Sequence, residues 1–400
     1  MSAVTTDVEA AKERVCAEVD RRADVLVDAA RQIHARPELG FEERFAHQLL
    51  TDIVEADGVH LQRHAFGLDT AFVGRAGEAG PTIAVLCEYD ALPGLGHACG
   101  HNIIAAAGLG AGLAVAALAD ELCGRVVILG TPAEEGGGGK VLMAERGAFD
   151  GVDAAMMVHP AGADLLSMNT IAIQQVWVDY HGEAAHAAAS PHQGRNALDA
   201  AVLGYVNVAA LRQHIRPTER LHGIFTRAGD KPNVVPSRAS AQWYVRSPTR
   251  ASLEPLKARV LACLEAGAMA AGCRMDHEWR DPIYDDMVDN APMIELYRRN
   301  AGRTGRELGD PRIVPGVVGS TDMGNVSHLV PSIHPMIKVA PAQVSIHSEG
   351  FVGHAASTDA DLAVIDGAKA LAMTVVDLWL RPDALDAAKA DFAAATARTR

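Results

Sequence analysis

The stretch CEYDALPGLGHACGHN, which begins at Cys87, gathers side chains that bind metal ions into one connection of the chain. It carries two acids, Glu88 and Asp90, and then a cysteine and a histidine, Cys99 and His101. Mixed sulfur, nitrogen and oxygen ligands suit a borderline metal such as zinc better than magnesium or calcium. Proline and glycine between them are typical of a rigid loop. The stretch therefore predicts part of a metal site, although Cys87, inside an apolar run, is expected to be a buried thiol.

Two further segments that we expect to be strands also end in potential ligands. GRVVILGTPAEE ends in Glu134 and Glu135, and DAAMMVHP ends with His159 before a proline. Ligands bind beyond the carboxyl ends of the strands in an open parallel sheet, so these side chains should meet the loop of Cys99 and His101. Residue types alone leave two alternatives open, a packed thiol at Cys99 and a core histidine at His159.

Four glycines, Gly136 to Gly139, precede Lys140 and invite comparison with a phosphate-binding loop. That pattern fails, because Glu134 occupies the position of its first glycine and Val141 stands where Ser or Thr is needed. A zinc nucleobase deaminase is excluded as well, since the chain lacks its P-C-x-x-C signature.

The elements that must position these residues alternate between helix and strand. This alternation, with apolar strands, predicts an α/β fold: a mostly parallel sheet sandwiched by helices. We expect strands at 69–77, 81–90, 124–135 and 153–160, and helices at 8–35, before Gly58, at 101–122, 139–149 and 359–380. An Ala-rich helix or coil should follow from Asp383.

The pattern changes near Asp164, where alternating strands and two helices predict a separate α+β unit. After about Pro282 the α/β pattern resumes. The sequence therefore predicts a discontinuous metal-binding catalytic domain, 1–168 with 285–400, and an inserted α+β domain at 169–284 that acts as a lid and in dimerisation.

Composition narrows the classes of function. A formal net charge of −14 without any cluster of Lys and Arg argues against nucleic-acid binding. The amino terminus has neither the basic nor the apolar region of a signal peptide, so we expect a cytoplasmic protein. The apolar run from Ile103 to Ala119 is mostly Ala and Gly without basic flanks, which favours a buried helix over a membrane span. The six cysteines show no paired spacing and are expected to be thiols.

A longer series of motifs carries a family resemblance, which runs from about His34 to Leu380. The series is CEYDALPG, HACGHN, TPAEEGGGG, VHP, HGEAAHAAASPHQGRNAL, PNVVP, YVR, GSTDMGNVSHLVP and IHSEGF. In this order it resembles the aminoacylase and glutamate-carboxypeptidase family of dinuclear metallohydrolases. Within it the chain is most similar to the amidohydrolase branch of aminobenzoyl-glutamate hydrolase subunits, hippurate hydrolase and auxin-conjugate hydrolases. Asn102 after CGH and the acids of CEYD favour the aminobenzoyl-glutamate hydrolase and dipeptidase-like members.

The resemblance implies two divalent metal ions, zinc in our prediction, with manganese or cobalt as alternatives. Glu134 would be the general base, beside a glutamate that holds metal, and Asp90 would orient a metal-binding histidine. His347 is preferred as the last ligand because HSEGF matches a family histidine, and His354 stays an alternative. The implied ligands, with Cys99 as the bridging one, are Cys99, His101, Glu135, His159 and His347.

The inserted unit contributes further implied residues. His186 resembles a lid histidine that stabilises the tetrahedral oxyanion, often in the partner subunit's site. Asn233 and Arg246 match lid residues that contact the substrate, and the guanidinium fork of Arg246 suits a carboxylate. A surface ion pair is the alternative for Arg246.

Together these features predict a cytoplasmic, homodimeric, metal-dependent amidohydrolase. Its small-molecule substrate would be an N-acyl amino acid, an aminobenzoyl-glutamate-like conjugate or a dipeptide, cleaved at the amide bond by activated water. The alternative is a catalytically silent metal-binding relative, or the structural subunit of a heteromeric hydrolase. We expect neither nucleic-acid nor membrane partners.

Overall fold

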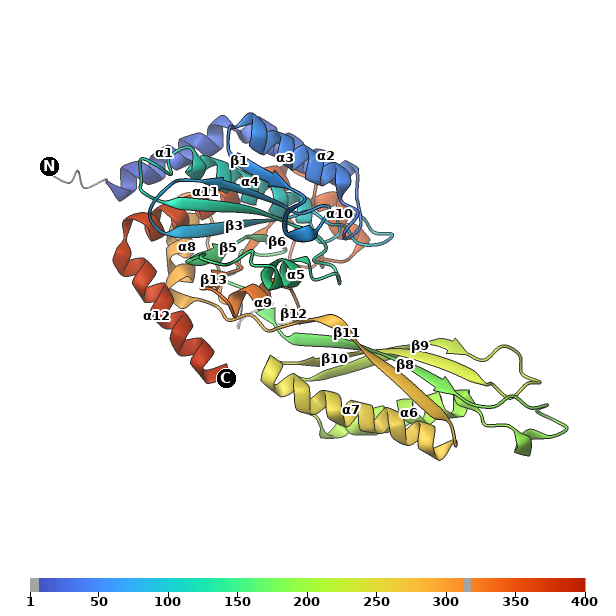
Figure 1. Ribbon diagram of the computed structural model, residues 1–400. Helices are drawn as coiled ribbons and strands as arrows, with labels where there is room; N and C mark the ends of the chain where they lie inside the picture. Colours follow the sequence, from blue (N-terminus) through green and yellow to red (C-terminus); the bar gives the residue numbers. More distant parts are fainter. Residues whose placement is uncertain (1–6, 312–317, 400) are drawn as a thin grey trace. The chain divides into compact units, whose positions relative to one another are not determined.

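The computed structural model of the protein describes residues 7–311 and 318–399 (Figure 1). The chain divides into two compact units, each described here by itself. Met1–Asn169 and Met287–Arg400 form the first, called the sheet unit, and Thr170–Asp286 form the second, called the inserted unit. The roles predicted for the two parts, catalysis and a lid for dimerisation, stay predictions.

A six-stranded sheet is the centre of the sheet unit. In spatial order its strands are β1 (His60–Arg63), β2 (Phe72–Ala76), β4 (Arg125–Thr131), β3 (Thr82–Glu88), β5 (Ala154–Met156) and β13 (Ser332–Ile333). β4, β3, β5 and β13 are parallel, whereas β1 and β2 are antiparallel additions at one edge. The prediction of a mostly parallel sheet is thus confirmed, and β1 and β13 are strands that it lacked.

Both faces of this sheet are buried, as the apolar strands predict. Along β3, Ile83 and Val85 join one hydrophobic cluster while Ala84 and Leu86 join another, because successive side chains of a strand point to opposite faces. The first cluster packs against α1 (Val8–Arg21), α2 (Ala23–Ala35), α3 (Arg44–Ala56), α4 (His101–Ala116), α8 (Ala291–Arg303), α11 (Thr358–Leu380) and α12 (Pro382–Thr399). The second packs against α5 (Gly139–Glu145) and α9 (Met323–Ser327).

Helix α4 confirms the buried helix expected for the apolar run from Ile103. It lies so close to β3 that a Cβ at Gly108 would be 2.3 Å from the carbonyl oxygen of Leu86. Nowhere in residues 7–311 and 318–399 is there a helix whose length and apolar character would let it cross a membrane.

The first helix of the sheet unit differs from the prediction, whereas its last segment is the helix that was one of two alternatives there. The single helix predicted for 8–35 is interrupted at Arg22, whose guanidinium donates hydrogen bonds to Glu18 and Asp57. The Ala-rich tail is the helix α12, with Ala388 in the core and its carbonyl oxygen accepting from the Asn290 side chain at 2.8 Å.

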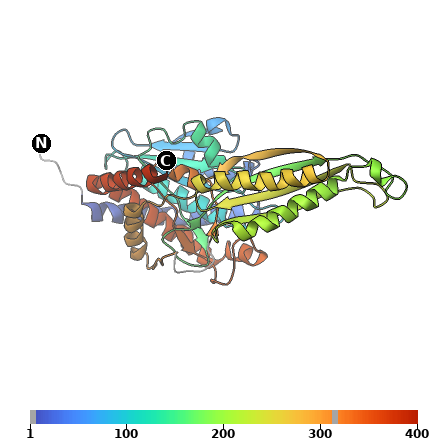
Figure 2. The same ribbon diagram turned by 90° about the horizontal axis from the view of Figure 1, so that it is seen from below.

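The inserted unit is an α+β sandwich of one sheet and two helices (Figures 1 and 2). Its strands, in order β11 (Arg274–Tyr284), β8 (Ala172–His181), β10 (Arg238–Ser247) and β9 (Arg220–Ala228), are all antiparallel to their neighbours. Helices α6 (Ala197–Leu211) and α7 (Arg250–Ala270) cover one face and share its core. Figure 2 shows the two helices running side by side. The inserted α+β part of the predicted fold class is therefore confirmed.

Short elements complete the chain. They are η1 (Ala65–Gly67), β6 (His159–Ala161), β7 (Asn169–Thr170), η2 (Pro191–Gln193), η3 (Arg212–His214), β12 (Val318–Gly319), β14 (Met336–Lys338) and α10 (Glu349–His354). β14 pairs with β6 in parallel, which continues the strand direction of the sheet beyond β5 and β13.

Candidate active site

Two strand ends of the sheet unit, those of β3 and β4, bring predicted acids to one edge of the sheet. β3 ends at Glu88 and leads into Asp90, and β4 leads through Pro132 into Glu134. The strand predicted at 153–160 is instead divided: β5 ends at Met156, and His159 begins β6, which pairs with β14 in a separate two-stranded sheet. Because β3 and β4 are parallel, their carboxyl ends open at the same edge, as expected for ligand sites in such sheets.

The loop before α4 delivers the thiol and one imidazole. Gly100 has φ 78°, a left-handed conformation that glycine adopts without strain, and α4 starts at the next residue, His101. A Cβ at Gly100 would lie 2.6 Å from the ring of Pro160, so only glycine lets this loop approach the strand of His159. Cys99 and His101 are both buried.

The predicted ligand atoms lie close together. The Sγ of Cys99 is 3.4 Å from Nε2 of His159 and 3.3 Å from Nε2 of His347. Oε1 of Glu135 is 3.0 Å from Nε2 of His347. Ligand atoms within 4.8 Å of one another form three groups: Cys99, His101 and His159; Cys99, Glu135 and His347; and His101, Glu134 and Glu135. Cys99 belongs to two groups, each holding three of the five predicted ligands.

His347 and His354 differ clearly in position. His347 has φ 63° and its main-chain N–H donates to the carbonyl oxygen of Ala98 at 2.8 Å, which turns its ring toward Cys99. His354 is the last residue of α10, and within the described part of the chain it joins no such group.

Hydrogen bonds to the outer nitrogens of two histidines aim their rings. Nδ1 of His101 is 3.0 Å from Oδ1 of Asp90, and Oδ2 of Asp90 accepts from the main-chain N–H of Glu135 at 2.9 Å. Nδ1 of His159 donates to the carbonyl oxygen of Pro160 at 2.8 Å. In both rings Nε2 is left to face the group, which is the arrangement of metal-ligating histidines.

The electrostatics of this cluster fit divalent cations. Burial, and then the charges of Glu135, Glu88 and Asp322, raise the pKa of Glu134 well above its usual value. Burial likewise raises the pKa of the Cys99 thiol. The buried Nε2 of His101 makes no hydrogen bond within residues 7–311 and 318–399. Bound cations would compensate the negative charge that these buried acids and the thiolate carry. The set of sulfur, nitrogen and oxygen donors is one that borderline metals prefer.

Sequence reasoning missed Glu43, which supports the turn before the two glutamates. Its buried carboxylate accepts from the hydroxyl of Thr70 at 2.7 Å and from the main-chain N–H of Ala133 at 2.8 Å. Ala133 has φ 56°, an unusual conformation for alanine, directly before Glu134. Burial raises the pKa of Glu43 to about 7, although the hydrogen bond from Thr70 opposes that shift. The only signal in the sequence is a glutamate shortly after PELGF.

Two more buried features escaped prediction. Lys140, the residue after the four glycines, pairs with Glu88 and with Asp322 of the GSTDMG motif. His334 is buried with its ring centroid 5.4 Å from that of His159, and neither nitrogen makes a hydrogen bond within the described residues. In the sequence, Lys140 stands out only through the comparison with a phosphate-binding loop. Nothing in the local sequence distinguishes His334 from a surface histidine.

The other three predicted residues belong to the inserted unit. His186 is exposed, and its Nδ1 accepts from the N–H groups of Ala188 and Ala189 at 3.2 and 3.1 Å. Asn233 lies beside it, since the N–H of Ala187 donates to the Asn233 carbonyl oxygen at 3.1 Å. Arg246, on β10, is half-buried and makes no ion pair with any residue that the structure describes; its Nε also lacks a hydrogen bond there.

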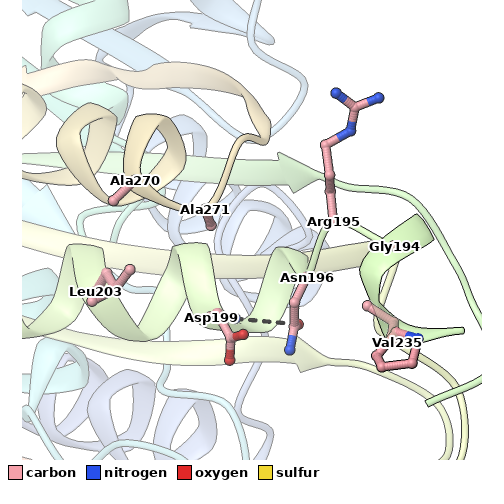
Figure 3. A pocket seen from close by; sticks show the side chains of 9 residues that line it. Gly194, Arg195, Asn196, Asp199, Leu203, Val235, Ala270 and Ala271 are labelled. Carbon is pink, nitrogen blue, oxygen red and sulfur yellow. Dashed lines mark hydrogen bonds between the residues drawn. The ribbon is translucent and has the colours of Figure 1, made fainter. Parts of the chain in front are cut away.

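Figure 3 shows a pocket of the inserted unit with a cavity volume of about 380 Å³. It is lined by Pro191, Gly194, Arg195, Asn196, Asp199, Leu203, Val235, Ala270 and Ala271. The bond drawn runs to Asn196, whose side chain caps α6. These residues are not those predicted for catalysis, so we assign the pocket no part in the site.

The fold and the donor set are those of a metal-dependent hydrolase. The sequence profile of Peptidase family M20/M25/M40 matches residues 84–375. The chain is 39% identical over 402 residues to an Xaa-Arg dipeptidase of Mus musculus, covering 96% of this chain and 93% of the relative. It is 35% identical over 300 residues to a p-aminobenzoyl-glutamate hydrolase subunit of Escherichia coli (strain K12), covering 68% and 62%. A crystal structure of a dinuclear metal binding peptidase of the M20 family from Bacillus subtilis has the same fold, with a TM-score of 0.63 at 20% identity over 87% of this chain and 98% of that chain.

The chain therefore belongs to the M20/M25/M40 peptidase family. The predicted resemblance is confirmed, and so is the prediction of a metal-dependent enzyme that hydrolyses amide bonds.

Proposed function

We propose that this enzyme is a dipeptidase that uses two divalent ions bridged by Cys99. The observation that carries the proposal is that Cys99 belongs to two groups of ligand atoms, one with His101 and His159 and one with Glu135 and His347. When bound, a pair of divalent ions lowers the pKa of water and polarises the scissile carbonyl. Zinc is the metal we propose, because a thiolate and three imidazoles favour it over magnesium, with manganese or cobalt as alternatives.

In this proposal Glu134 is the general base. Its Oε2 is 3.9 Å from Nε2 of His101, so it lies beside the ligand atoms, while its neighbour Glu135 contacts His347. Glu134 takes a proton from the attacking water and returns it to the leaving amine. Asp90 holds His101 by one oxygen and the Glu135 main chain by the other, and thereby fixes both in place.

The substrate we propose is a dipeptide with a free carboxyl-terminal carboxylate. A relative that matches nearly the whole chain is named for dipeptides that end in arginine, so these are the first substrates to try. Arg246 is the group proposed to bind the carboxylate, because its half-buried guanidinium makes no ion pair among the described residues. Asn233 would contact the same substrate, and His186 would stabilise the oxyanion.

We also propose that the enzyme is a homodimer formed through the inserted unit. β9 is an edge strand that exposes Ile224, with 64% of its surface accessible, and Phe225. Helix α6 exposes Val202, Leu203 and Val206. Unpaired edges and exposed apolar side chains favour association with a second copy. A location in the cytoplasm stays a prediction.

A substrate screen tests the function. The purified chain, stripped of metal and reconstituted with Zn²⁺, Mn²⁺ or Co²⁺, is given Xaa-Arg dipeptides, aminobenzoyl-glutamate and N-acetyl amino acids, and the free amine is measured. The matched control is each dipeptide as its carboxamide, which should react about 10- to 100-fold more slowly because it loses a charge-assisted hydrogen bond. If no conjugate is cleaved with any metal, the silent relative or structural subunit replaces the dipeptidase.

A further inference from the structure

A lysine is buried next to the proposed metal site. Lys140, the second residue of α5, is fully buried, and its Nζ is 2.6 Å from Oδ1 of Asp322 and also pairs with Glu88. Its main-chain N–H donates to the other oxygen of Asp322 at 2.9 Å. Both carboxylates are buried as well. One cation is thus enclosed by two acids that are remote from each other in the sequence.

Glu88 lies as near to one proposed ligand, His101, as the two glutamates of the proposed mechanism do, although it belongs to none of the three groups of ligand atoms. Its Oε2 is 3.6 Å from Nε2 of His101, while Glu134 and Glu135 approach the same atom at 3.9 and 4.0 Å. By distance alone Glu88 could also bind a metal held by His101. Glu88 differs from Glu134 and Glu135 in that its other oxygen, Oε1, pairs with the ammonium group of Lys140.

We infer that Lys140 is an internal counter-cation that, with Asp322 as its second partner, withholds Glu88 from the metal ions and so determines which carboxylates ligate them. The inference rests on the proposed function, and it makes Lys140 a positioning residue. A divalent ion attracts every available carboxylate within reach, and a third acid would fill a coordination position that water and substrate need. Because Lys140 already pairs with Glu88 and Asp322, Glu135 is the carboxylate that binds the metal ions. Its neighbour Glu134 acts as the base.

Stability alone explains this arrangement poorly. Buried ion pairs add little to folding, since desolvation of the charges offsets their attraction, and apolar residues of similar volume often replace them without loss. A lysine between two acids therefore indicates a need for a cation at this position.

The test releases Glu88 without changing the total charge. In wild type Glu88, Lys140 and Asp322 carry a net charge of −1, and Lys140→Met with Asp322→Asn leaves −1 on Glu88 alone. The asparagine side chain introduced at position 322 keeps an oxygen that can accept from the main-chain N–H of residue 140. With bound Co²⁺ as the probe, we expect weaker visible absorption than in wild type, because an added carboxylate raises the coordination number. Dipeptide hydrolysis should fall about 10- to 100-fold.

The matched control adds Glu88→Gln to the same pair of substitutions. With the released carboxylate removed, the Co²⁺ spectrum should return to that of wild type, whereas a merely structural defect would persist. A spectrum of K140M/D322N that equals wild type overturns the inference. If the double variant does not fold, Glu88→Gln alone is the test, because Lys140 still pairs with Asp322 in that variant. An unchanged Co²⁺ spectrum and metal content supports the inference. Loss of metal shows that Glu88 is itself a ligand and overturns it.

Failure of the proposed function looks different. If wild type binds no pair of ions, or keeps its full metal content after Cys99→Ser, the metal site itself is wrong. If wild type binds two ions that Cys99→Ser loses, and the released Glu88 leaves the Co²⁺ spectrum unchanged, only the role of Lys140 is wrong.

Discussion

At the scale of single residues, the thiol of Cys99 belongs to both groups of ligand atoms that consist of predicted ligands alone. It contacts His159 and His347, which come from distant parts of the chain. Burial raises the pKa of this thiol, so the thiolate requires the compensating charge of metal ions. The two imidazole nitrogens that face its Sγ favour ligation over the simple packing that the sequence leaves open.

Cys99→Ser should lose metal and activity together. A serine hydroxyl is not deprotonated near neutral pH, so it does not replace a bridging thiolate. Elemental analysis of the purified variant measures the loss, and circular dichroism checks that the fold is kept. Full metal occupancy in the serine variant would show that Cys99 only packs.

The adjacent glutamates should respond differently to the same substitution. Glu134→Gln is expected to keep the metal ions and to lose about 10²- to 10⁴-fold in kcat, the usual contribution of general acid–base catalysis. Glu135→Gln should instead lose metal, because an amide is a poor ligand for these ions. Metal content and kcat are measured for both variants, each serving as the control for the other. The opposite pattern would mean that the two roles are exchanged.

Glu43 should make stability fall as pH rises. Its pKa in the folded protein is about 7, raised from 4.5 by burial, so the folded state binds more protons than the unfolded state between these values. Its contribution is fully present below pH 4.5 and is lost as pH rises through about 7. Relative to Glu43→Gln, the free energy of unfolding of wild type should therefore decrease by about 3 kcal/mol over this range.

Denaturant unfolding at a series of pH values measures this difference. Glu42→Gln is the matched control, since it removes an exposed carboxylate of the same segment. Its curve should run parallel to wild type. If the Glu43→Gln curve is parallel too, burial does not hold a proton on Glu43.

At the scale of elements, the approach of α4 to β3 positions the loop of Cys99 against the strand ends. Gly108→Ala should destabilise the protein by about 1–3 kcal/mol, because the new Cβ would meet the Leu86 main chain at 2.3 Å. Gly110→Ala in the same helix meets flexible Leu26 methyl groups and should cost less. Thermal unfolding of the two variants compares them, and equal losses would contradict a rigid contact at Gly108.

Many of the helices and strands were predictable from local sequence patterns. Apolar runs located β3, β4 and β5, and the ligand types at their ends predicted which side chains would meet. The break at Arg22 was not predictable, because it depends on Asp57, which is remote in sequence. The same holds for Lys140 with Asp322, and for Glu43 with Ala133. Such contacts depend on how strands and helices are ordered in space, which periodicity does not reveal.

At the scale of the whole molecule, the predicted site residues are divided between the two units of the chain. The ligand groups lie in the sheet unit, whereas His186, Asn233 and Arg246 lie in the inserted unit. The exposed apolar side chains of α6 and β9 favour a two-fold dimer, the commonest soluble oligomer. We therefore expect His186 to complete the site of the other subunit, where exclusion of water would strengthen its hydrogen bond to the oxyanion.

Complementation between subunits tests this arrangement. Homodimers of Glu134→Ala and of His186→Ala should each be nearly inactive. Co-expressed, the two variants form mixed dimers in which the intact Glu134 of one chain meets the intact His186 of the other. Random pairing makes about half of the dimers mixed, each with one working site of two, so roughly a quarter of wild-type activity should return in the mixture and about half in the isolated mixed dimers. The mixed dimers are isolated with two different affinity tags, and Glu134→Ala with Glu134→Ala under both tags is the control. Isolated mixed dimers as inactive as their parents would place the action of His186 within its own chain, or outside catalysis.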